Sequence, residues 1–116
     1  MLVVEDDAAG RELMAEVARR EGLAVREATN GVEGLARLNE RPLPAAIILD
    51  LEMPLMHGLD FLRELRKVPG AMEIPVILVS GHATVSGLEA LAVAAILPKP
   101  ISVAKLASTL RSLVEW

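Results

Sequence analysis

Short, mostly apolar runs alternate with longer segments of helical period along the whole sequence. This alternation predicts an α/β fold in which crossover helices join the strands of an open, doubly wound parallel sheet. Short aliphatic strands suit a sheet that helices cover on both faces. The expected strands are 2–5, 24–28, 45–50, 75–79 and 94–97.

The segments between these runs have the apolar spacing of amphipathic helices. A first helix is expected over 8–20, and a second is expected to begin after an Asn30 cap. A fourth helix, signalled by Ser86 to Glu89, is weak because Gly81 and Gly87 interrupt it. The expected buried positions are Leu13, Met14 and Val17 in the first helix, Val32, Leu35 and Leu38 in the second, Leu59, Leu62 and Leu65 in the third, and Val103, Leu106, Leu110 and Leu113 behind a Ser102 cap in the last.

The size and composition of the chain exclude several classes of function. At 116 residues we expect one domain with one site. A net charge of −4 argues against a surface that coats nucleic acid. The chain has no cysteine, which excludes disulfides and thiolate sites, and its longest apolar stretch is far shorter than a membrane span. We therefore expect a soluble, cytoplasmic protein that binds neither membrane nor nucleic acid directly.

Polar side chains follow four of the five expected strands. The first strand ends in Glu5 and Asp6, the third in Asp50, the fourth in Ser80, and Lys99 follows the fifth. Ligands of doubly wound sheets lie beyond the carboxyl ends of the strands. The sequence therefore predicts that these side chains meet at one edge of the sheet.

Three carboxylates at one edge need a counter-charge. Each pair repels by about 4 kcal/mol at 4 Å with an effective dielectric constant near 20. Mg²⁺ suits a set of oxygen ligands and shares them with a substrate phosphate. With Lys99 and the Ser80 hydroxyl nearby, the arrangement indicates phosphoryl transfer, with Asp50 as the nucleophile.

These residues resemble those of the receiver domain of bacterial two-component response regulators. The likeness covers nearly the whole chain and lies in four motifs that occur in order, LVVEDDAAGRELM, ATNGVEGL, IILDLEMPLMHGLDFL and PVILVSGHA, followed by PKP. It implies a flavodoxin-like (βα)5 fold with five parallel strands in the order 2-1-3-4-5. Residues 1–116 would then form one receiver domain, a signalling switch that catalyses only its own phosphorylation and dephosphorylation.

The resemblance also implies roles for the acidic residues. Asp50 would accept a phosphoryl group from a sensor histidine kinase, a histidine phosphotransfer protein or a small phosphodonor. Asp6 and Asp50 would bind Mg²⁺ together with the main-chain carbonyl of Glu52, and Glu5 would assist through water. The oligomeric state is left open, and a homodimer is one alternative.

The remaining site residues match the family at two positions. Ser80 corresponds to the hydroxyl residue that bonds the phosphoryl group, and Lys99 to the lysine that binds it. The resemblance implies a cis bond between Lys99 and Pro100. The histidines His57 and His82 flank the site, and either is a candidate for orienting the water that hydrolyses the acyl phosphate.

The chain departs from the family in its fifth strand. Ile96 stands where most members carry Tyr or Phe, so the usual ring rotation after phosphorylation cannot occur. The segment between Ser80 and Lys99 is about three residues shorter than the family pattern and lacks Gly-Ala before the strand. These departures favour one alternative, an interaction module that signals without phosphorylation. A second alternative is an aspartate-nucleophile phosphohydrolase, because such enzymes also place an Asp after an apolar strand. Their second acid normally lies two residues on, where this chain has Glu52, and 116 residues leave no room for a substrate cap.

Overall fold

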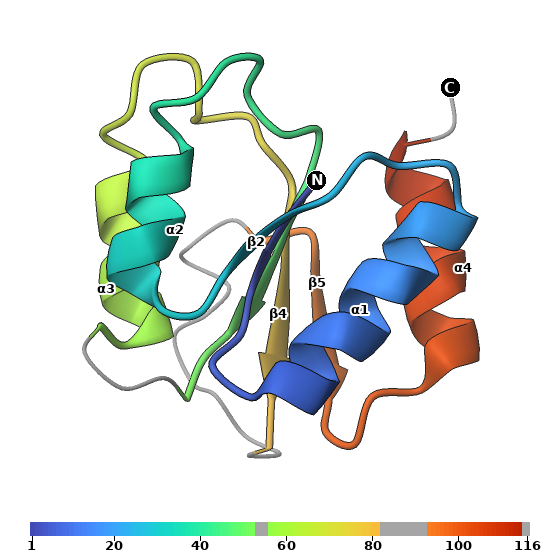
Figure 1. Ribbon diagram of the computed structural model, residues 1–116. Coiled ribbons are helices and arrows are strands. Elements are labelled where there is room, and N and C mark those ends of the chain that lie inside the picture. The colour runs from blue at the N-terminus through green and yellow to red at the C-terminus, as the bar shows by residue number, and fades with distance from the viewer. Residues whose placement is uncertain (53–55, 82–92, 115–116) are drawn as a thin grey trace.

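The computed structural model describes residues 1–52, 56–81 and 93–114. Its strands form one parallel sheet in the order β2-β1-β3-β4-β5 (Figure 1), which confirms the predicted fold class and strand order. The strands are β1 (Leu2–Val4), β2 (Arg26–Ala28), β3 (Ile47–Asp50), β4 (Val76–Ser80) and β5 (Ala95–Pro98). The helices are α1 (Ala8–Arg20), α2 (Gly31–Arg37), α3 (Gly58–Leu65) and α4 (Val103–Val114).

The helices cover the sheet in two layers. Helices α1 and α4 lie side by side on one face, and α2 and α3 lie on the other (Figure 1). Neighbouring residues of a strand face opposite layers, so Val3 packs in the cluster beneath α1 and α4, and Val4 in the cluster beneath α2 and α3. The predicted helix near Ser86 to Glu89 lies outside the described residues. No helix in the described ranges is long and apolar enough to cross a bilayer.

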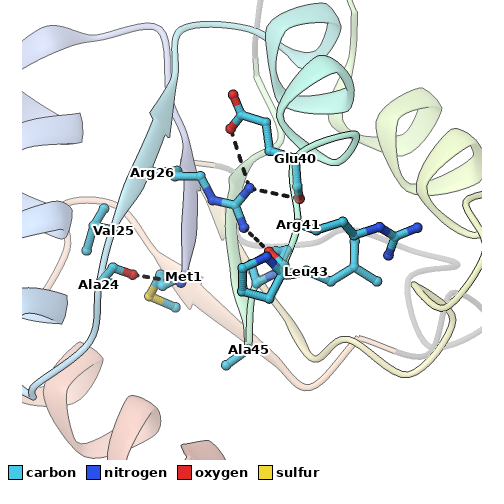
Figure 2. Close-up of a pocket in the computed structure, with 10 residues that line it drawn as sticks. Met1, Ala24, Val25, Arg26, Glu40, Arg41, Leu43 and Ala45 are labelled. Carbon is cyan, nitrogen blue, oxygen red and sulfur yellow. Dashed lines mark hydrogen bonds and ion pairs between the residues drawn. The ribbon is translucent and has the colours of Figure 1, made fainter.

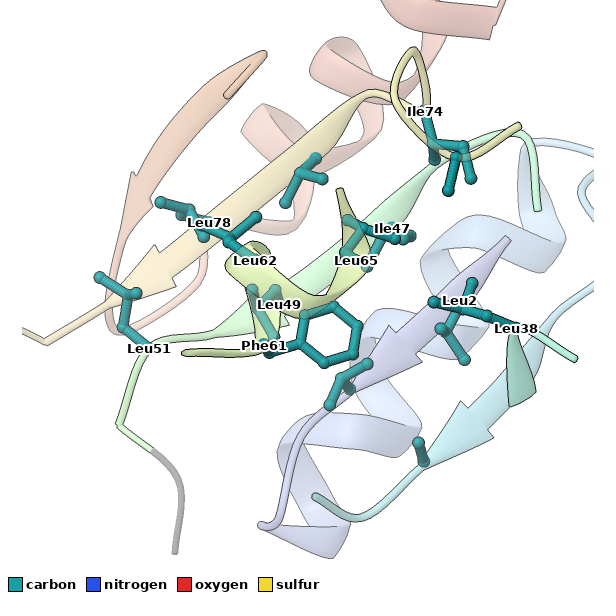
Figure 3. Close-up of a cluster of buried hydrophobic side chains, with 14 residues drawn as sticks. Leu2, Leu38, Ile47, Leu49, Leu51, Phe61, Leu62, Leu65, Ile74 and Leu78 are labelled. Atoms are coloured by element: carbon teal, nitrogen blue, oxygen red, sulfur yellow. The ribbon is translucent and has the colours of Figure 1, made fainter. Parts of the chain in front are cut away.

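Phe61, the only Phe, Tyr or Trp among the described residues, lies in the layer formed by α2 and α3. Its side chain is fully buried among aliphatic residues of β1, β3 and the flanking helices (Figure 3). Helix α2 passes close to this ring: a Cβ atom added at Gly34 would lie only 2.9 Å from Cε2 of Phe61. Glycine at this position therefore allows α2 to approach α3.

The predicted helix starts are confirmed by their caps. Asp7 accepts a hydrogen bond from the N–H of Gly10 at 2.8 Å, and Asn30 accepts one from the N–H of Glu33 at 2.8 Å. Ser102 accepts one from the N–H of Lys105 at 3.2 Å. The three helices therefore begin directly after these capping residues, at Ala8, Gly31 and Val103.

Three residues that we expected in the core are exposed. The exposed fraction is 43% for Leu13, 55% for Val32 and 44% for Val103. The prediction for Val32 was wrong because Gly31 and Gly34, not Val32, form the buried face of α2. Leu13 is exposed because small residues also take part in the buried stripe of α1, which consists of Met14, Ala15, Val17 and Ala18.

Candidate functional site

The carboxyl ends of β1, β3, β4 and β5 bring the predicted site residues to one edge of the sheet. Asp50 is paired in register with Val79, so Ser80 lies one residue beyond it on the next strand. The N–H of Lys99 donates to the carbonyl of Ser80 at 2.9 Å, which places the lysine beside the same edge. The predicted convergence of acids, hydroxyl and ammonium on one edge is therefore found.

The turn after Asp50 packs directly against the start of α3. The N–H of Gly58 donates to the carbonyl of Leu51 at 3.1 Å. A Cβ atom at Gly58 would lie 2.8 Å from Cα of Leu51, so only glycine allows this approach of main chain to main chain. The end of β3 and the first turn of α3 are thus held together next to the site.

The carboxylate of Asp50 is fully buried and its two oxygens differ. Oδ1 lies 2.9 Å from Nζ of Lys99 and accepts a hydrogen bond from the N–H of Glu52 at 3.1 Å. Oδ2 has no hydrogen-bond partner within the described part of the chain. A buried carboxylate oxygen without a donor is costly, so this atom marks a position where a cation or an electrophile is stabilising.

The neighbouring acid, Glu5, is also buried. Burial of Glu5, together with the negative charge of Asp50 beside it, raises the pKa of Glu5 to about 8, although Lys99 acts in the opposite direction. Burial by itself would lower the pKa of Lys99, but its contact with Asp50 and the charges of Glu5 and Glu52 raise it. Two buried acids face one partly exposed lysine here, so a further positive charge beside them is stabilising.

The donor atoms of this acidic cluster fit a divalent cation. One carboxylate oxygen from each of Glu5, Asp6 and Asp50 lies within 4.8 Å of the others. Asp6 is exposed, so the cluster is open to solvent on one side. Hard oxygen ligands, excess negative charge and the Asp50 oxygen without a donor are what a divalent metal ion requires. The cluster can therefore hold a metal ion.

The hydroxyl of Ser80 is engaged by the side chain of Glu52. Ser80 Oγ donates to Oε1 of Glu52 at 2.9 Å, and the N–H of Gly81 donates to the same oxygen at 3.1 Å. Burial would raise the pKa of Glu52, but these hydrogen bonds outweigh it and hold the pKa below its usual value. The sequence predicted a role in binding Mg²⁺ for the main-chain carbonyl of Glu52 but not this side-chain contact. The signal in the sequence was an acidic residue two positions after Asp50.

Of the two histidines that flank the site in the sequence, the structure describes His57. His57 caps α3, since its Nδ1 accepts a hydrogen bond from the N–H of Leu59 at 3.1 Å. This is a structural role that sequence reasoning did not consider. His82 lies outside the described residues. The peptide bond between Lys99 and Pro100 is cis, as the resemblance implied.

A separate pocket lies at the opposite edge of the sheet, among the residues that precede β1, β2 and β3 (Figure 2). Arg26 lies at its wall and is occupied by the chain itself, because its guanidinium donates to the carbonyls of Arg37, Glu40 and Pro42. Among the described residues that line this pocket, Glu40 is the only acid, so they form no acidic cluster like that at the carboxyl edge. Arg26 here fixes the loop that follows α2, which is a structural role. The candidate site is therefore the carboxyl edge of the sheet.

Comparison with known proteins places this arrangement among signalling proteins. The family model for the response regulator receiver domain matches residues 1–111. The sensor histidine kinase CheAY of Helicobacter pylori is 36% identical over 85 residues, which cover 72% of this chain and 11% of that protein. The transcriptional regulatory protein CpxR homolog of Haemophilus influenzae is 33% identical over 119 residues, covering 99% of this chain and 50% of that protein.

A solved structure supports the same architecture. The chemotaxis response regulator CheY4 of Vibrio cholerae superposes with a TM-score of 0.88 at 24% identity, covering 97% of this chain and 96% of that one. At this identity the likeness shows the fold. The chain spans half or less of the length of the two curated relatives described above.

Proposed function

This chain belongs to the response regulator receiver domain family, and we propose that Asp50 is its phosphoacceptor and that residues 1–116 act as one phosphorylation-controlled switch. One observation carries the proposal. The buried Asp50 carboxylate has one oxygen fixed by Lys99 at 2.9 Å and a second oxygen without a donor, beside an acidic cluster. That second oxygen is available to attack phosphorus or to bind a cation.

The chemistry of transfer follows from these contacts. An oxygen of Asp50 attacks the phosphorus of a phosphohistidine, and a P–O bond forms as the P–N bond breaks. The imidazole nitrogen leaves with the electron pair of that bond. Lys99 offsets negative charge on Asp50 and on the incoming phosphoryl oxygens, and the hydroxyl of Ser80 donates a hydrogen bond to one of them.

Mg²⁺ is the cation that we assign to the acidic cluster. Asp6 and Asp50 would bind it with the main-chain carbonyl of Glu52, and Glu5 would act through water. When bound, the ion supplies positive charge that neutralises the carboxylates and the phosphoryl oxygens. This assignment is supported by the set of carboxylate oxygens within 4.8 Å of one another.

The partner that we propose is a sensor histidine kinase or a histidine phosphotransfer protein. The support is the kinship with receiver sequences, including that of a protein named as a sensor histidine kinase. In this role the chain turns over no external substrate beyond the phosphodonor, and it catalyses its own phosphorylation and slow dephosphorylation. The cytoplasmic location, the lack of direct nucleic-acid or membrane binding, and the alternative of a homodimer stay predictions.

The proposal is tested by incubation with acetyl phosphate and Mg²⁺, followed by intact mass spectrometry. We expect wild type to gain one phosphoryl group and Asp50→Asn to gain none while keeping its circular dichroism spectrum. Asp60→Asn, at an exposed residue of α3 that pairs with Arg63, is the matched control and should react as wild type does. Equal labelling of Asp50→Asn and wild type would refute the assignment of the nucleophile.

A second candidate function is an interaction module that signals without phosphorylation. The observation in its favour is Ile96, which is half exposed on β5 and has no aromatic ring to change its orientation. The acetyl phosphate experiment separates the two functions. If wild type gains no adduct at saturating Mg²⁺, the second candidate is favoured.

A further inference from the structure

The end of β4 offers two hydrogen-bond donors that point at one oxygen. These are the hydroxyl of Ser80 and the main-chain N–H of Gly81, and both reach Oε1 of Glu52, at 2.9 and 3.1 Å. Ser80 is buried, so its hydroxyl has little access to water. Two converging donors at a buried strand end form a binding position for one anionic oxygen.

This position lies beside the phosphoacceptor. Ser80 follows Val79, the residue paired with Asp50 across the parallel strands, and Lys99 contacts both the carbonyl of Ser80 and Oδ1 of Asp50. A phosphoryl group on Asp50 brings its own anionic oxygens to the same edge. A phosphoryl oxygen and the Glu52 carboxylate can therefore each accept hydrogen bonds from the same two donors.

The two donors cannot satisfy both ligands. A serine hydroxyl and a main-chain N–H each donate one hydrogen, so the donors that hold Glu52 are not available to a phosphoryl oxygen. Two negative groups at this position would also repel each other. Occupation by Glu52 and occupation by a phosphoryl oxygen are thus mutually exclusive.

The local chain geometry explains why Glu52 reaches this position. Asp50 Oδ1 accepts the N–H of Glu52, a bond from a side chain to the main chain two residues later that folds the chain back after β3. This turn directs the Glu52 side chain toward the end of β4. The contact with Ser80 spans 28 residues of sequence, so it depends on the sheet and not on a local helix or hairpin.

We propose that the carboxylate of Glu52 is an internal occupant of the phosphoryl-binding position, and that phosphorylation of Asp50 displaces it from Ser80 and Gly81. This inference rests on the proposed function of Asp50. Before phosphorylation, the occupant slows entry of the phosphodonor. After phosphorylation, a charged side chain is released at the edge of the sheet, which is a conformational change that needs no aromatic ring at Ile96.

The first test compares rates of adduct formation from acetyl phosphate and Mg²⁺ by intact mass. We expect Glu52→Ala to react faster than wild type on the order of tenfold, because a hydrogen-bonded charged competitor is removed. The isosteric Glu52→Gln, which keeps an oxygen acceptor without the charge, should show a smaller increase. Glu73→Gln, at an exposed loop residue, is the control and should match wild type.

The outcomes separate this inference from the proposed function. If wild type is labelled on Asp50 and both Glu52 variants react no faster, the inference that Glu52 occupies the phosphoryl-binding position is refuted. The assignment of Asp50 as the phosphoacceptor is then still supported. Labelling of Glu52→Ala alone supports Glu52 as the occupant but overturns its displacement by phosphorylation, because the carboxylate then keeps the phosphoryl group out of the wild-type site. If no variant is labelled, both are overturned.

A second test distinguishes occupation of the donors from a general effect of charge. In a Ser80→Ala background the hold on Glu52 is already weakened, so Glu52→Ala should accelerate the reaction by a smaller factor than it does in wild type. Equal factors in both backgrounds would mean that the charge of Glu52 acts at a distance, and would refute the inference. The amide proton of Gly81 should move upfield in the NMR spectrum of Glu52→Ala, since it loses a carboxylate acceptor; an unchanged shift would contradict the contact.

Discussion

Nζ of Lys99 lies 2.9 Å from Oδ1 of Asp50, an ion pair that joins the end of β5 to the end of β3 across the intervening strand β4. Asp50 is fully buried, whereas Lys99 is partly exposed. The lysine can therefore follow a phosphoryl group as it arrives from solvent while it still offsets the buried charge. Asp50 thus accepts the phosphoryl group, and Lys99 supplies the positive charge beside it.

Lys99→Ala should slow phosphorylation of Asp50 by acetyl phosphate and Mg²⁺, because the variant loses the cation that lies 2.9 Å from the Asp50 carboxylate. Loss of a charged hydrogen-bond donor at such a position reduces rates on the order of a hundredfold. Intact mass spectrometry over time measures the rate. Lys67→Ala is the control and should leave the rate unchanged. It removes an exposed lysine that pairs with Glu64 at the end of α3.

Mg²⁺ should stabilise the folded protein, because the acidic cluster exists only when β1 and β3 are paired. A ligand at a hundred times its dissociation constant adds about 2.7 kcal/mol to the free energy of unfolding. Thermal unfolding in EDTA and in increasing MgCl₂ measures the effect. Asp6→Asn should need more Mg²⁺ for the same shift, and Asp60→Asn should behave as wild type; an equal response of Asp6→Asn would exclude that carboxylate as a ligand.

Gly34→Ala should destabilise the protein even though alanine favours helix by about 1 kcal/mol. The added Cβ would lie 2.9 Å from Cε2 of Phe61 and 3.1 Å from Cγ2 of Val4, and overpacking a core costs about 1 to 3 kcal/mol. We expect a net loss of about 1 kcal/mol in urea unfolding, the difference between these two effects. In a Phe61→Leu background the substitution should cost less; a stabilising Gly34→Ala would show that α2 is free to move outward.

Glu21→Gln should lower stability at neutral pH and have little effect in acid. Arg111 hydrogen-bonds Glu21 at 2.7 Å between Nε and Oε1 and holds the pKa of that carboxyl below its usual value. Because the pKa is lower in the folded state, the stabilisation is present above the unfolded pKa of 4.5 and is lost as the pH falls through the folded pKa. Denaturant unfolding from pH 7 downward measures the difference in stability between variant and wild type, with Glu12→Gln, on the helix α1 that Glu21 caps, as control. A gap that persists in acid would mean that packing, not charge, links α1 to α4.

The positions of the site residues could be predicted from the sequence because parallel strands end at a common edge. Once Asp50 and Ser80 were assigned to strand ends, their proximity followed from the fold alone. The direction of the Glu52 side chain did not follow, since it depends on a turn and on a donor pair from another strand. Val32 shows the same limit, because the buried face of α2 is set by how closely α3 approaches and not by hydrophobicity.

The contact between Gly58 and Leu51 has a mechanical consequence. Side chains can absorb a small shift by changing rotamer, but two main-chain segments in direct contact have no such slack. The strand that ends at Asp50 and the helix that begins at Gly58 therefore share a stiff joint. A displacement of a few tenths of an ångström at the strand end is therefore expected to move the start of α3, and a side chain at position 58 would push the two segments apart and weaken this coupling.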